Sequence, residues 1–110
     1  MNITADMPNV TKCEPLEFYD LGGYQAIIVR DVPNMAGIPS PTEYLYVMVL
    51  CPEGQGLPLF YVTAEKGMTG SVFLCTFDQD GNHSNYGADE DWSNLDSFTT
   101  AALSMLKEVI

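Results

Sequence analysis

Basic residues are scarce in this chain of 110 residues, which contains 4 Lys and Arg against 15 Asp and Glu and has a formal net charge of −11 at pH 7. Proteins that bind nucleic acid or anionic lipid use clustered basic side chains to neutralise phosphates. Too few cations are present here to build such a surface. We therefore expect no direct binding to nucleic acid or to a membrane.

Long apolar runs and paired cysteines are also lacking. No stretch approaches the roughly 18 apolar residues of a membrane-spanning helix, and the first twenty residues lack the basic start and apolar segment of a secretory signal. The three cysteines, Cys13, Cys51 and Cys75, form no CxxC pair, so their spacing is typical of neither a disulfide framework nor a zinc site. These absences predict a cytoplasmic protein with reduced, packed thiols and with no bound metal or cofactor.

Catalytic motifs are missing as well. The sequence contains no GxSxG, P-loop or GxGxxG motif, and His83, its single histidine, would have to carry any imidazole-based proton transfer. Asp78, Asp80 or Glu90 would be the carboxylate that orients it. A thiol nucleophile would need Cys51 or Cys75 beside this histidine, and the neighbours of both cysteines indicate burial. We predict that the protein is not an enzyme.

The acidic residues of the segment 78–89 match a calcium loop only weakly. Asp78, Asp80, Asn82 and Asp89 occupy the first, third, fifth and twelfth positions of such a loop. The sixth position requires glycine for a sharp turn, and His83 stands there. A hairpin turn at Asp80 and the glycine after it explains the same residues more simply.

Most of the chain between residues 16 and 87 has strand character. Short runs of β-branched and aromatic residues are separated by turn dipeptides such as Gly22-Gly23. The predicted strand segments are 16–21, 24–32, 43–51, 57–64, 71–78 and 82–87, the last a polar edge strand. The three prolines of residues 33–42 predict a loop, and the polar residues 1–13 predict a loose N-terminal arm.

The hydrophobic period changes near the carboxyl end of the sequence. Apolar residues recur at three- and four-residue steps from Leu95 to Val109, and Ser93 with Asp96 forms an acceptable capping pair before them. This pattern predicts an amphipathic helix. Residues 1–110 are therefore expected to form a single α+β domain, in which an antiparallel sheet of about five strands, mostly a meander, carries one C-terminal helix on one face.

The central strands are apolar on both faces, and one helix covers only one of them because a helix is about 10 Å wide. Something else has to cover the second face. We expect a homodimer to do so. The alternatives are that the sheet curls on itself, or that residues 1–13 and 33–42 fold over this face.

Acidic residues cluster between the last predicted strand and the helix. Residues 78–96 contain six carboxylates and no Lys or Arg. One explanation is structural, because carboxylates near a helix N-terminus stabilise the helix through its dipole. The functional hypothesis is a docking surface for a basic protein partner, as in an inhibitor or adaptor, with charge from Asp89, Glu90 and Asp91 and with Trp92 as the anchor. Trp92 could equally staple the helix to the sheet.

A second hypothesis concerns the aromatic residues of the sheet. Strict alternation along the strands allows Tyr24, Tyr44, Tyr46 and Tyr61 to share one face with Met48. Aromatic rings in an acidic environment attract organic cations, so this face predicts a binding site for a small organic cation, in a groove or at a dimer crevice. Ordinary core packing is the alternative interpretation.

Overall fold

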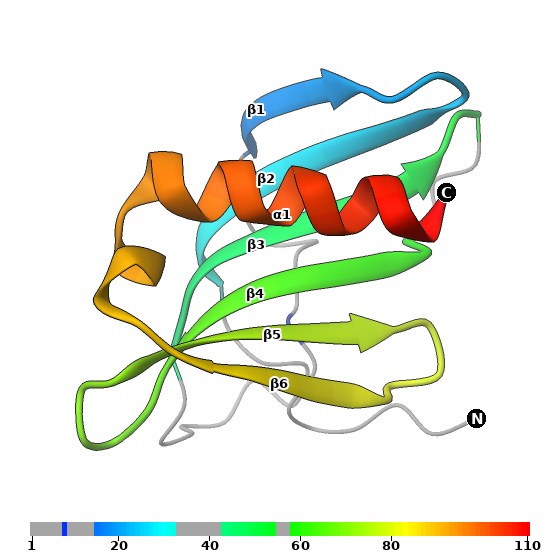
Figure 1. Cartoon of the computed structure of the whole chain (residues 1–110). Coiled ribbons are helices and arrows are strands. Elements are labelled where there is room, and N and C mark those ends of the chain that lie inside the picture. Colours follow the sequence, from blue (N-terminus) through cyan, green and yellow to red (C-terminus); the bar gives the residue numbers. More distant parts are fainter. Residues whose placement is uncertain (1–7, 9–14, 33–42, 55–57) are drawn as a thin grey trace.

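The computed structural model of the chain describes residues 8, 15–32, 43–54 and 58–110. Six strands form one antiparallel sheet in the order β1-β2-β3-β4-β5-β6, so each strand pairs with the next one along the chain (Figure 1). The strands are β1 (Pro15–Asp20), β2 (Tyr24–Val32), β3 (Glu43–Pro52), β4 (Phe60–Lys66), β5 (Val72–Asp78) and β6 (His83–Ala88). A 3-10 turn, η2 (Glu90–Ser93), leads into the helix α1 (Leu95–Val109). The predicted α+β meander is confirmed, with one strand more than the expected five.

Helix α1 lies across one face of the sheet (Figure 1). Its side chains Phe98, Ala102 and Leu106 are fully buried, and their spacing of four residues places them on one side of the helix. They belong to the helix-side core, which also contains Ala26, Ile28, Met48, Leu50, Val62, Ala64, Val72 and Leu74. The amphipathic helix is thus placed as predicted. No helix in the described ranges combines the length and apolar character needed to cross a membrane.

The start of α1 differs from the prediction by one residue. The side chain of Asn94 accepts a hydrogen bond of 3.0 Å from the Ser97 backbone N–H, so Asn94 is the cap. Ser93 closes the preceding turn instead, because its hydroxyl donates to the carbonyl oxygen of Glu90 at 2.7 Å. The predicted capping pair of Ser93 and Asp96 is therefore wrong, since η2 uses the serine before the helix begins.

The second face of the sheet is buried within a single chain. Its core, which we call the second-face core, consists of Val29, Val32, Tyr44, Val47, Val49 and Phe77, each at most 4% exposed. These side chains have almost no exposed surface even without a second chain, and the homodimer expected from the sequence stays a prediction. Pro8, in a β-bridge, is fully buried. The rest of the predicted arm 1–13 and the predicted loop 33–42 lie outside the described residues.

A β-bulge in β3 breaks the strict alternation that the sequence predicts. Tyr44 pairs with Glu65 and Tyr46 pairs with Ala64, so Leu45 is an additional residue between two pairs. As a result, Tyr44 joins the second-face core while Leu45 and Tyr46 pack against the helix-side core. A shift of one residue moves a side chain to the opposite face of a sheet. The bulge therefore separates tyrosines that alternation would have kept together.

Candidate functional site

The acidic residues after β6 are held by η2. The backbone N–H of Asp89 donates to the Val72 carbonyl oxygen at 3.1 Å, which joins the start of the turn to β5. The Asp89 side chain caps η2 by accepting a hydrogen bond of 2.9 Å from the Asp91 backbone N–H. Asp89, Glu90 and Asp91 are all exposed. The carboxylates of the predicted docking surface therefore sit side by side on a short turn that the sheet fixes in place.

Trp92 has a different place from the other three residues of this predicted surface. Its side chain is half-buried and packs against the helix-side core. This packing agrees with the alternative interpretation of Trp92, in which it joins the helix to the sheet. The part of Trp92 that remains accessible lines a shallow depression on α1 with Ser97, Ala101 and Ser104 among its neighbours. Trp92 therefore attaches η2 to the helix-side core. Its role as an anchor for a partner stays a prediction.

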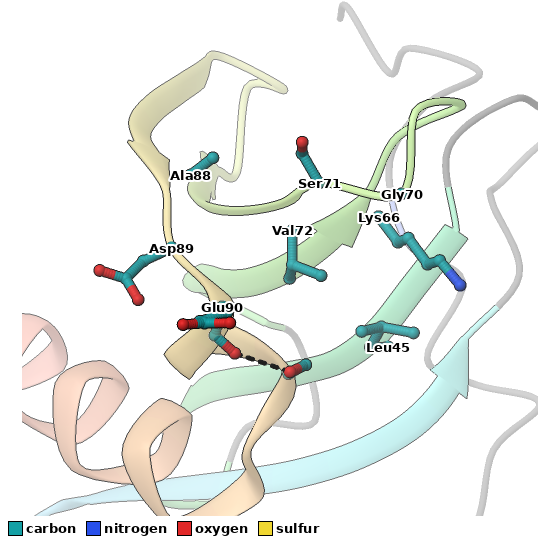
Figure 2. A pocket seen from close by; sticks show the side chains of 9 residues that line it. Leu45, Lys66, Gly70, Ser71, Val72, Ala88, Asp89 and Glu90 are labelled. Atoms are coloured by element: carbon teal, nitrogen blue, oxygen red, sulfur yellow. Dashed lines mark hydrogen bonds between the residues drawn. The ribbon is translucent and has the colours of Figure 1, made fainter.

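A cavity of about 630 Å³ lies beside η2, and we call it the acidic groove. Its lining combines apolar, acidic and basic residues: Leu45, Lys66, Gly70, Ser71, Val72, Ala88, Asp89, Glu90 and Ser93. Figure 2 shows Leu45 and Val72 between Lys66 on one side and Asp89 with Glu90 on the other. The groove thus has an apolar floor and walls of opposite charge. The acidic wall was predicted from the sequence, whereas the apolar floor, which strands β3 and β5 supply, was not.

The five residues of the predicted aromatic face lie on two faces of the sheet. Tyr24, Tyr46 and Met48 belong to the helix side, whereas Tyr44 and Tyr61 belong to the second face. The prediction of one shared face is wrong for two reasons. The bulge in β3 turns Tyr44 away from Tyr46, and the register of β4 places Tyr61 opposite Val49.

The individual contacts of these tyrosines are those of core residues. The ring of Tyr46 stacks on Phe98 with centroids 5.5 Å apart, and its hydroxyl donates to the Ser93 carbonyl oxygen at 3.2 Å. Tyr44 meets Phe77 edge to face at 6.3 Å and is 3% exposed. Met48 is fully buried. Tyr24 lines a pocket of about 300 Å³ with Phe18 and Tyr19, but the five predicted residues share no groove in the described part of the chain. Ordinary core packing describes Tyr44, Tyr46 and Met48.

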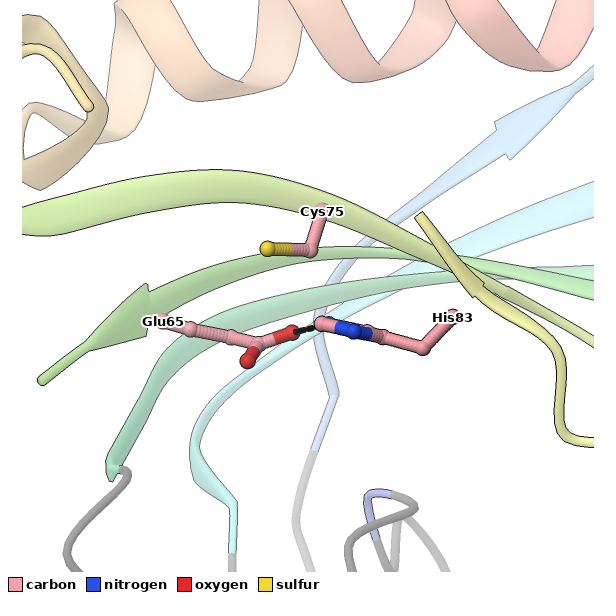
Figure 3. Close-up of side chains that lie close together, drawn as sticks. All are labelled: Glu65, Cys75 and His83. Carbon is pink, nitrogen blue, oxygen red and sulfur yellow. Dashed lines mark hydrogen bonds and ion pairs between the residues drawn. The ribbon is translucent and has the colours of Figure 1, made fainter. Parts of the chain in front are cut away.

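A cluster of four polar side chains, three of them buried and His83 exposed, interrupts the apolar second face. The hydroxyl of Thr63 donates to Glu65 Oε2 at 2.7 Å, and His83 Nε2 lies 2.9 Å from the same oxygen. Cys75 lies beside Glu65 and His83 (Figure 3). The potential ligand atoms of these three residues are all within 4.8 Å of one another. Buried polar groups are informative because their burial has a cost unless they are paired. We call these four residues the polar cluster.

Strand pairing brings the polar cluster together from three strands. Thr63 in β4 is paired with Cys75 in β5, and His83 in β6 is paired with Phe77. Glu65 follows Thr63 by two residues and therefore points to the same face. The His83 ring also rests on Phe77, with centroids 4.5 Å apart. The predicted strand ended at residue 64, whereas β4 continues to Lys66, so the sequence analysis missed the inward position of the charged Glu65.

The turn before β6 sets the position of His83. The sequence predicts a two-residue hairpin at Asp80-Gly81, but Gly81 N–H donates to the Asp78 carbonyl oxygen and Asp78 N–H donates to Asn82, both at 3.1 Å. The bond between Asp78 and Asn82 leaves residues 79–81 as a three-residue loop. The positive φ of Gly81, 86°, is typical of the last residue of such a loop. The Asp78 carboxylate accepts hydrogen bonds from Asn82 and Asp80, and the Asn82 side chain contributes most to lowering its pKa. These carboxylate oxygens therefore hold the turn.

The electrostatics of the polar cluster keep Cys75 protonated. Burial is the main cause that raises the pKa of the Cys75 thiol, and the Glu65 charge and a hydrogen bond to Glu65 raise it further, against a smaller opposing effect of Thr63. A protonated thiol is a poor nucleophile. The partner of His83 is Glu65, so the expectation that Asp78, Asp80 or Glu90 would orient this histidine is wrong.

The thiols in the described part of the chain, Cys51 and Cys75, are both free. Cys75 is buried and Cys51 is half-buried, as the predicted reduced and packed state requires. Cys13 lies outside the described residues. The spacing of the cysteines gave no indication of a metal site, but pairing of β4, β5 and β6 assembles three possible ligands that lie far apart in sequence.

Comparisons of this chain with protein-family models, with curated proteins and with solved structures found no match. Two features of the described residues stand out as candidate sites. They are the acidic groove beside η2 and the polar cluster on the opposite face of the sheet.

Proposed function

We propose that this protein is a non-enzymatic interaction module that docks a basic segment of a partner protein in the acidic groove. The observation that carries the proposal is one cavity in which an apolar floor, Leu45 and Val72, adjoins the carboxylates of Asp89 and Glu90. An arginine or lysine side chain fits this arrangement, because its aliphatic stem packs on apolar surface while its charged head pairs with a carboxylate. Such docking is how an inhibitor or adaptor would hold its partner.

Charge supports the same choice of partner. The net charge of −11 attracts a basic protein over a distance and raises its association rate. Asp91 continues the acidic wall along η2. Lys66 on the other wall repels a cation, so it directs the head of a docked arginine or lysine toward Asp89 and Glu90 (Figure 2). The groove therefore favours one orientation of the bound side chain.

Rigidity of the acidic wall lowers the cost of docking. The bond from Asp89 to Val72, the cap on Asp91 and the packing of Trp92 hold η2 before any partner arrives. A site that is ordered in advance loses less conformational entropy when it binds. In this proposal Trp92 is a support for η2, and the contact with the partner is made by the groove.

The test is a titration of isotopically labelled protein with short peptides that carry one arginine between apolar residues. We expect the largest amide shifts at Ser71, Val72 and Glu90. The triple variant Asp89→Asn/Glu90→Gln/Asp91→Asn should bind at least tenfold more weakly, because a charge-assisted hydrogen bond contributes about 1.5–3 kcal/mol. Asparagine caps a helix as well as aspartate does, so η2 keeps its cap in this variant.

A matched control separates the groove from general acidity. The variant Glu53→Gln/Asp80→Asn/Glu108→Gln removes the same number of negative charges from exposed positions outside the groove. We expect it to keep nearly all of the affinity. Equal weakening by the two triple variants, or amide shifts spread over the whole acidic surface, would show that the groove is not the docking site.

A further inference from the structure

We propose that Glu65, Cys75 and His83 form a binding site for a Zn²⁺ ion. A carboxylate oxygen, a sulfur atom and an imidazole nitrogen converge there, all within 4.8 Å of one another (Figure 3). Zinc bonds of about 2.0–2.3 Å in tetrahedral geometry place ligand atoms roughly 3.5 Å apart. Binding would therefore bring the most distant ligand atoms about 1 Å closer together and open the 2.9 Å contact between His83 Nε2 and Glu65 Oε2 slightly. This site goes beyond the proposed docking function and does not depend on it.

The three donor types select the kind of ion. Thiolate, imidazole and carboxylate together are ligands of zinc, whereas Mg²⁺ and Ca²⁺ prefer sites made of oxygen atoms. Glu65, Cys75 and His83 come from β4, β5 and β6, so the pairing of three strands fixes their relative positions. Three protein ligands leave one tetrahedral position for water or for a further ligand.

Two of the proposed ligands are buried and the third is exposed, so an ion could enter from solvent and still bind in a largely buried position. Cys75 is 1% exposed and the Glu65 side chain is 10% exposed, so the inner part of the site is dry. The His83 side chain is 40% exposed on the edge strand β6, and it provides the route from solvent. Thr63 donates to Glu65 Oε2 at 2.7 Å, which is the outer hydrogen bond that orients a ligating carboxylate.

Charge balance also favours a divalent cation beside this carboxylate and thiol. Binding breaks the S–H bond of Cys75, the sulfur electron pair forms the Zn–S bond, and the proton passes to the buffer. The thiolate and the Glu65 carboxylate together then neutralise the two charges of the ion, and His83 binds as neutral imidazole. Because the ion displaces the thiol proton, affinity should increase with pH.

The experiment uses Co²⁺ as a spectroscopic probe in the variant Cys13→Ser/Cys51→Ser, which retains Cys75 as its one thiol. We expect one Co²⁺ per chain, a thiolate-to-cobalt charge-transfer band in the near ultraviolet and visible bands of tetrahedral coordination. One equivalent of Zn²⁺ should abolish both sets of bands. A pH-stat titration should show about one proton released per ion.

Three further changes in that background test two of the ligands and the outer hydrogen bond. Cys75→Ser should abolish the charge-transfer band, and His83→Ala should weaken Co²⁺ binding by more than tenfold. Thr63→Val should weaken binding by about 10–100-fold while the charge-transfer band remains, as loss of an outer hydrogen bond does. His83 stands on an exposed edge strand, so its replacement disturbs the core less than a change at the buried Cys75, although its contacts with Phe77 and Glu65 are also lost.

The opposite results would overturn the proposal. A protein that retains Cys75 and shows no charge-transfer band with excess Co²⁺ has no such site. Bands of equal intensity in His83→Ala would exclude the three-ligand arrangement. The variant Asp80→Asn is the control. Asp80 is exposed and lies outside the polar cluster, so this change should leave the cobalt spectrum unchanged.

Discussion

Replacing Phe98 by alanine tests how α1 is held on the sheet and, through it, how the acidic groove is built. Phe98 is fully buried, belongs to the helix-side core and stacks on Tyr46. Truncation of a buried phenylalanine costs about 3–5 kcal/mol, because apolar contacts are lost and a cavity remains. With a urea m-value of about 2 kcal/mol per molar, the unfolding midpoint should fall by about 1.5–2.5 M.

The assay can use the single tryptophan of the chain. Trp92 packs against the same core, so its fluorescence reports when the contact between η2, α1 and the sheet is lost. The control is Val109→Ala, which removes apolar atoms from the same helix at a position that is 42% exposed. That change should cost less than about 1 kcal/mol. If Phe98→Ala lowered the midpoint no more than Val109→Ala does, the described packing of α1 would be wrong.

Four further predictions concern the turn before β6, the thiols and the oligomeric state. Hydrogen bonds lower the pKa of Asp78 in the folded protein, so its stabilising contribution is present above the unfolded pKa and is lost as pH falls through the lower folded value. Asp78→Asn should therefore flatten the acid limb of a plot of unfolding midpoint against pH, and an unchanged limb would contradict this. Gly81→Ala should cost about 1–2 kcal/mol in urea unfolding, because alanine resists the positive φ of this turn. With Ellman's reagent at neutral pH, Cys75 should react more slowly than Cys51 until denaturant is added, since Cys75 is buried, and equal rates would refute its burial. Light scattering should give the mass of one chain, 12.1 kDa, because one chain already buries its second face. Twice this mass would support the homodimer expected from the sequence.

The sequence was sufficient for the elements that local patterns determine. Gly22 and Gly23 have φ values of 65° and 88°, which is the hairpin conformation that a pair of glycines predicts. The three- and four-residue steps between Leu95 and Val109 predicted α1 because such steps define one side of a helix. Asp89 and Glu90 were identified from composition alone, since a run of acidic residues needs no knowledge of the fold.

Features that depend on the pairing of distant residues could not be predicted in this way. Nothing in the local sequence marks Leu45 as a bulge, and this one extra residue decides the face on which Tyr44 lies. The polar cluster depends on the register of three strands, which sets Cys75 opposite Thr63 and brings His83 to Glu65. Each residue was visible in the sequence, but their proximity is a property of the sheet.

The unbroken strand order of the sheet also bears on how the chain is made. Each strand from β2 onward pairs with its predecessor, so the sheet can assemble strand by strand during synthesis, without pairing strands that are distant in sequence. The helix α1 emerges from the ribosome only after all six strands, and its 15 residues take about 1–3 s to translate. During that interval the apolar side chains of Met48, Leu50 and Val62 lack the helix that will bury them. The incomplete sheet therefore exposes apolar surface, which favours aggregation, until α1 covers it.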